Sequence, residues 1–186
     1  MVELEERSQN SDKLIKVAIT GPESTGKSTL ACTLATHYKT VWVPEYARNY
    51  LNNLNHPYTF EDVEKIAREQ IAIEDKLLTN AKNLLICDTE LIVIKIWMDY
   101  KYHLVPAWIN EEIKKRYYDI YLLCDIDIPW EPDPLRENPV LREFFFDWFK
   151  KEINDLNGNC IIISGDQEHR SVTATTEIDK LFQSSF

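Results

Sequence analysis

The chain has 186 residues, 44% of them hydrophobic, which is enough to build one domain with a sizeable core. Its 31 acidic residues outnumber the 21 basic ones, giving a formal net charge of −10. A surface this acidic repels polyanions, which argues against nucleic acids and anionic membranes as partners and favours small neutral or cationic molecules.

Residues 1–13 are charged and aperiodic, and we expect a flexible leader there, followed by a single domain over 14–186. An apolar run over 15–19 then leads into the sequence GPESTGKS at 21–28, a full match to G-x-x-x-x-G-K-[ST]. Apolar residues at helical spacing follow, up to about residue 38. Strand, glycine loop and helix in this order are the context in which the motif indicates a phosphate-binding P-loop.

The physical chemistry of a P-loop assigns roles to its residues. Glycines let successive backbone N–H groups point at phosphate oxygens, and the following helix adds its positive N-terminal end. Lys27 would reach the β- and γ-phosphates of ATP, and the Ser28 hydroxyl would bind Mg²⁺. The residues expected to hold the nucleotide are Gly21, Glu23, Ser24, Thr25, Gly26, Lys27, Ser28 and Thr29.

The remaining elements alternate between strands and helices. A short strand at 41–43 ends at Pro44, and an Asn-rich loop covers 52–58. A capping-box pattern, Thr59 with Asp62, starts a long helix that should end near residue 82. Further strands are expected at 84–88, 119–124 and 160–164, with helices around Trp97, at 144–153 and at 172–182. The continuous apolarity of the strands, and their alternation with helices, predict a three-layer α/β/α fold with a five-stranded parallel sheet.

The four cysteines, Cys32, Cys87, Cys124 and Cys160, stand far apart, with no C-x-x-C pair. Three of them lie in apolar runs that look like central strands, so we expect buried, reduced thiols and neither a disulfide framework nor a metal site. No apolar run is long enough to span a membrane, and the acidic start is unlike a signal peptide. These features predict a cytoplasmic protein, and they leave a homo-oligomeric state open.

Two carboxylates follow strands and are candidates for catalysis. Asp88 closes the third strand and would hold Mg²⁺ directly or through water, although an acid can also simply cap a strand end. Glu45 follows the second strand, where it could accept the proton of an attacking hydroxyl. The alternative for Glu45 is a surface acid paired with Arg48, which could instead orient Glu45 or bind substrate hydroxyls.

A proline-rich segment after the fourth strand, residues 127–142, is predicted to form a lid. Its Arg136 and Arg142 could move onto the transferring phosphoryl group and the nucleotide, and closure would remove water. Solvated arginines in an acidic loop are the alternative. Gln70 on the long helix could bind a substrate amide or lie on the helix surface, and Trp97 and Trp130 could be core, cover or ligand platforms.

These motifs together resemble the ribosylnicotinamide kinase domain of bacterial NadR-type proteins over nearly the whole chain after the leader. The resemblance is carried by GPESTGKST at 21–29, Glu45-Tyr46-Ala47-Arg48, Asp88-Thr89-Glu90, and Asp127-Ile128-Pro129-Trp130 followed by Leu135-Arg136. It implies a fold like nucleoside monophosphate kinases, ATP with Mg²⁺, and phosphorylation of nicotinamide riboside to its mononucleotide. The family's roles would fall on Lys27, Ser28, Glu45, Arg48, Asp88 and Arg136.

The chain departs from the family pattern at two places. Bifunctional members carry an adenylyltransferase domain before the kinase, whereas a short leader precedes it here, so we expect that second activity to be absent. Better-known members also have a tryptophan immediately before the Glu-Tyr pair, where Pro44 stands here. Aromatic and acidic groups for the cationic nicotinamide ring would instead come from Trp42, Glu45, Tyr46 and Tyr50, with Asp127 to Trp130 closing over them. Two alternatives remain: a kinase whose acceptor is another nucleoside or a vitamin alcohol, and an ATP-binding regulatory switch that has no acceptor.

Overall fold

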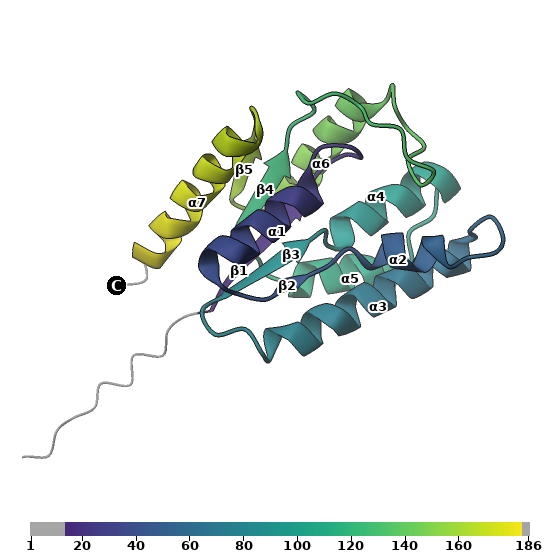
Figure 1. The fold of residues 1–186 in the computed structure, drawn as a ribbon. Coiled ribbons are helices and arrows are strands. Elements are labelled where there is room, and N and C mark those ends of the chain that lie inside the picture. The colour runs from purple at the N-terminus through teal and green to yellow at the C-terminus, as the bar shows by residue number, and fades with distance from the viewer. Residues whose placement is uncertain (1–13, 184–186) are drawn as a thin grey trace, which may run out of the picture.

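The structure, a computed structural model, describes residues 14–183 and is built around a five-stranded parallel sheet (Figure 1). The strand order is β2-β3-β1-β4-β5, so the strand that precedes the P-loop lies at the centre. Parallel strands need crossover connections, and helices supply them here. The strands are β1 (Ile15–Thr20), β2 (Trp42–Val43), β3 (Leu84–Asp88), β4 (Ile120–Cys124) and β5 (Cys160–Ile163).

Helices cover both faces of the sheet and form the outer layers. The helices α1 (Lys27–Tyr38) and α7 (Gln167–Gln183) lie on one face. The other face is covered by α3 (Phe60–Leu78), α4 (Leu91–Tyr102), α5 (Ala107–Lys115) and α6 (Arg142–Asp155). A short helix, α2 (Tyr46–Asn52), packs on α3.

The central strands are buried because their side chains alternate between two hydrophobic cores. Val17 and Ile19 of β1 pack with the core under α1 and α7, whereas Ala18 joins the core under α3 to α6. All five residues of β3 and of β4 are buried. Two-sided burial explains why these strands read as continuous apolar runs rather than as alternating patterns.

The predicted three-layer fold, its five strands and its parallel sheet are confirmed. The Thr59 capping box is also present, with the Thr59 hydroxyl accepting from the Asp62 N–H. Two short helices, α2 and α5, were not predicted, α3 ends earlier at Leu78, and α7 begins earlier at Gln167. Short helices carry too few periodic positions to stand out from a loop. The expected leader, 1–13, lies outside the described residues.

The prediction about cysteine burial is right for Cys87 and Cys124 and wrong for the other two. Cys32 is exposed on the outer side of α1, and Cys160 is half-buried because β5 is an edge strand rather than a central one. None of the four is in a disulfide. Within residues 14–183, no helix combines the length and apolarity needed to cross a bilayer.

Candidate active site

The P-loop lies at the carboxyl edge of the sheet, immediately after β1. Gly21 has φ of 130°, and a Cβ there would lie 2.9 Å from the carbonyl oxygen of Cys124, so only glycine fits. Gly26 has φ of 78° and caps α1, which places the positive end of that helix at the loop. The Lys27 ammonium donates to the carbonyl oxygens of Gly21 and Pro22, at 2.9 and 2.7 Å.

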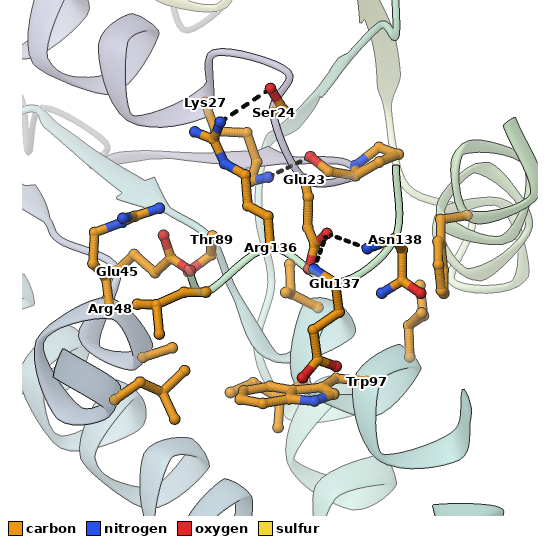
Figure 2. A pocket seen from close by; sticks show the side chains of 18 of the residues that line it. Glu23, Ser24, Lys27, Glu45, Arg48, Thr89, Trp97, Arg136, Glu137 and Asn138 are labelled. Atoms are coloured by element: carbon orange, nitrogen blue, oxygen red, sulfur yellow. Dashed lines mark hydrogen bonds between the residues drawn. The ribbon is translucent and has the colours of Figure 1, made fainter. Parts of the chain in front are cut away.

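A cavity of about 480 Å³ opens beside this loop (Figure 2). Its walls come from the P-loop, α2, α4, the start of α6 and the lid segment. Of the residues expected to act on nucleotide or substrate, the lining includes the eight P-loop residues named above together with Glu45, Arg48, Gln70, Arg136 and Arg142. A single cavity therefore joins the phosphate loop to the side chains expected to bind an acceptor.

Asp88 and Ser28 meet where a metal ion would sit in a P-loop protein. The register pairs Ile19 with Asp88, so the end of β3 lies beside the start of the loop. Asp88 is 3% exposed, and its Oδ1 has no hydrogen-bond partner among the described residues, while the Ser28 side chain lies beside the same carboxyl. A buried acceptor without a partner beside a hydroxyl fits Mg²⁺, which prefers hard oxygen ligands and keeps several waters. These two residues would hold it.

Burial raises the pKa of the Asp88 carboxyl to about 6; the Ser28 hydrogen bond opposes that rise, and the Glu45 carboxylate adds to it. The following residues, Thr89 and Glu90, shape the same edge. Thr89 has φ of 70°, a strained value for a β-branched residue, and it lines the cavity. Glu90 is fully buried, caps α4 through the Ile92 N–H, and has its pKa raised to about 8 by burial.

Glu45 stands at the start of α2 with its side chain on the cavity wall (Figure 2). It makes no ion pair with any residue between 14 and 183, so the expected alternative of a carboxylate paired with Arg48 does not hold. Arg48 pairs instead with Asp133 of the lid, at 2.9 Å. Glu45 is therefore an unpaired carboxylate facing a cavity that starts at the P-loop, which leaves it able to accept a proton.

The lid is docked onto the P-loop in this structure. The Glu23 carboxylate accepts from the backbone N–H groups of Glu137 and Asn138, both at 3.1 Å. The Ser24 hydroxyl accepts from the Arg136 guanidinium at 3.2 Å. Each of these contacts involves the phosphate loop, so the position of the lid is coupled to the position of the loop.

Arg142 reaches the same place from the first turn of α6. It donates to the carbonyl oxygens of Ile128 and Ser24, at 2.9 and 3.1 Å. Its Nε is buried and has no partner within the described part of the chain. Both arginines thus lie at the cavity, as the sequence predicts for a lid that carries positive charge to the phosphates.

Four residues expected to bind substrate are placed differently. Gln70 lines the cavity, but its amide is taken up by the backbone, accepting from the Tyr46 N–H and donating to the Pro44 carbonyl. Tyr46 and Trp130 are not among the cavity residues. Asp127 also lies outside the cavity, because its carboxylate binds Arg170 and the Gly165 N–H.

Arg170 is a buried residue of this site that sequence reasoning missed. It is 5% exposed and donates to the carbonyl oxygens of Thr25, Asp125 and Gly165, as well as to Asp127. It thereby ties the P-loop to the ends of β4 and β5. An arginine so near the C-terminus carries no local motif, so the sequence offers no signal for this role.

The fold and loop together define a P-loop nucleotide-binding protein of the α/β class. The model of the AAA domain family matches residues 16–170. The chain therefore belongs to the AAA domain family.

Among curated proteins, the chain is similar to the trifunctional NAD biosynthesis/regulator protein NadR of Salmonella typhimurium and of Escherichia coli. Each is 28% identical over 124 residues, which cover 64% of this chain and 30% of the relative. The match therefore spans about 30% of the length of these relatives.

Three solved structures share the fold. The NadR protein in complex with NR superposes with a TM-score of 0.75 and 19% identity, over 90% of this chain and 50% of that one. Thymidylate kinase from Ehrlichia chaffeensis superposes with a TM-score of 0.64 and 15% identity, over 89% of this chain and 99% of that one. Deoxyadenosine kinase from M. mycoides with bound dATP superposes with a TM-score of 0.55 and 18% identity, over 89% of this chain and 99% of that one.

Proposed function

We propose that this protein is an ATP-dependent kinase that transfers the γ-phosphoryl group of ATP to the primary hydroxyl of a small nucleoside, with nicotinamide riboside as the preferred acceptor. The observation that carries the proposal is the single cavity, which runs from the P-loop to the unpaired Glu45 carboxylate. A regulatory switch would need the phosphate loop, but it would not need the same cavity to extend to a free base.

The residues divide the work of phosphoryl transfer as follows. The backbone of the P-loop and Lys27 would bind the phosphates, and Ser28 and Asp88 would hold Mg²⁺, which when bound neutralises charge on the β- and γ-phosphates. Glu45 would accept the proton of the acceptor hydroxyl. The docked lid would exclude water, which otherwise competes as the acceptor.

Nicotinamide riboside is favoured for two reasons. Its pyridinium ring carries a fixed positive charge, which suits a protein of net charge −10. The similarity to NadR proteins, whose structure with NR shares this fold, points the same way. Deoxyadenosine kinase shares the fold over nearly its whole length, so neutral nucleosides are the competing acceptors.

The test is a competition among acceptors with Mg-ATP and the purified chain. Nicotinamide riboside should give a higher kcat/KM than its uncharged reduced form, adenosine, deoxyadenosine, thymidine, cytidine or uridine. A neutral nucleoside that wins by about tenfold or more would leave the kinase standing and remove the nicotinamide assignment, since tenfold corresponds to about 1.4 kcal/mol. Slow ATP hydrolysis that no acceptor stimulates would favour the switch.

Arg136 provides a separate prediction about the lid. Arg136→Ala should lower kcat by about 100-fold while the KM for ATP changes little, because the charge that it neutralises develops mainly during transfer. Arg136→Lys should not restore the rate, since a point charge does not reproduce the planar guanidinium. Steady-state kinetics on the two Arg136 variants test this role. The control is Arg68→Lys, an exposed substitution on α3. A lysine variant as fast as the wild type would make Arg136 a surface residue.

A further inference from the structure

Four side chains at one end of the cavity form a hydrogen-bonded group, here called the Trp97 cluster: Tyr58, Trp97, Lys101 and Glu137. They come from three separate segments, the loop before α3, the helix α4 and the lid. All four line the cavity. Figure 2 shows Lys27 and Ser24 at one end of the view and Trp97 at the other, with the Glu137 carboxylate over the indole.

The hydrogen bonds of the cluster meet at the Tyr58 hydroxyl. Trp97 Nε1 donates to it at 3.0 Å, Lys101 also donates to it, and it donates to Glu137 at 2.8 Å. The Lys101 ammonium lies 3.4 Å from both oxygens of Glu137, which is a long contact for an ion pair. Lys101 therefore keeps donor capacity, and Glu137 keeps acceptor capacity, side by side.

The cluster is connected to the phosphate loop through Glu137. The carboxylate of this residue belongs to the cluster, and its backbone N–H donates to the Glu23 carboxylate of the loop. An acceptor with its hydroxyl at the P-loop would direct its base away from the loop, towards Trp97. The wall around Trp97 is apolar and includes Val93 and Phe145.

We propose that the Trp97 cluster reads the substituent on the acceptor's base and selects a carboxamide over the corresponding carboxylic acid. This inference rests on the proposed kinase function. Lys101 donates to the amide oxygen and Glu137 accepts from the amide NH₂, so both partners are satisfied. A carboxylate at the same place keeps Lys101 but sets two negative oxygens against Glu137, with no hydrogen to share.

The test compares nicotinamide riboside with nicotinic acid riboside in the wild type and two variants. The wild type should favour the amide by about tenfold or more in kcat/KM. Glu137→Gln should reduce that preference by about tenfold or more, because a glutamine amide can donate to a carboxylate. Lys101→Met should increase the preference, since the acid loses its one cationic partner. The two variants thus move the same ratio in opposite directions.

A cluster that only fastened the lid would behave differently. Both variants would then slow the two ribosides equally and leave their ratio unchanged, which would overturn the inference. Glu131→Gln, an exposed carboxylate change in the same lid, should leave the ratio at the wild-type value. If neither riboside is phosphorylated while another nucleoside is, the nicotinamide assignment itself fails and this inference falls with it; an unchanged ratio with active ribosides overturns this inference alone.

Discussion

Lys27→Ala should lower the rate of phosphoryl transfer by about 100-fold to 1,000-fold, because one lost charged donor at the developing phosphoryl charge costs about 3 to 4 kcal/mol. Lys27 lines the cavity and holds the carbonyl oxygens of Gly21 and Pro22 in the native loop. Its ammonium is therefore already positioned at the phosphate site.

The measurement is the single-turnover rate with saturating Mg-ATP, together with the thermal unfolding temperature. The variant should remain folded, since the glycines and the helix that shape the loop are untouched. Lys150→Ala, an exposed lysine change on α6, is the matched control and should have the wild-type rate. Near-normal turnover of Lys27→Ala would end the P-loop assignment.

Asp88→Asn and Glu45→Gln should both slow transfer strongly, by different routes. Asp88→Asn should raise the Mg²⁺ concentration needed for half-maximal activity, because the buried carboxylate beside Ser28 is lost. Glu45→Gln should leave the Mg²⁺ dependence and ATP binding intact and depress kcat, since only proton acceptance is removed. A Mg²⁺ titration and an ATP-binding measurement on each variant separate the two roles. The reverse pattern would exchange their assignments.

The pH dependence of Asp88 adds an independent signature. Its pKa in the metal-free protein is raised to about 6, so the Mg²⁺ concentration needed for half-maximal activity should rise as the pH drops through that value, because the proton and the metal compete for the same carboxylate. The contribution of Asp88 to the free energy of unfolding should increase as the pH drops. A carboxyl with a raised folded pKa stabilises the fold below its ordinary value near 4, and loses this contribution as the pH rises through about 6. Asp88→Asn should therefore be at least as stable as the wild type at pH 8 while far less active.

Much of the nucleotide site can be read from the sequence because its information is local. The P-loop is one continuous stretch whose glycines and helix start define its conformation, so eight of the predicted nucleotide residues line the cavity as expected. Asp88 was also predictable, since a buried parallel strand ends at the same sheet edge as the loop after β1. Arg136 and Arg142 were predictable as lid residues, although their contacts with Ser24 were not.

By itself, the sequence determined the P-loop, the five strands and the layered α/β fold, because each depends on residues that are neighbours along the chain. Only the tertiary structure decided what lines the rest of the cavity. Asp127 binds Arg170, which lies far along the chain, and the Tyr58 hydroxyl joins Trp97 to Glu137 of the lid. Contacts between distant segments leave no periodic or spaced pattern in the sequence, so side-chain direction there is set by packing.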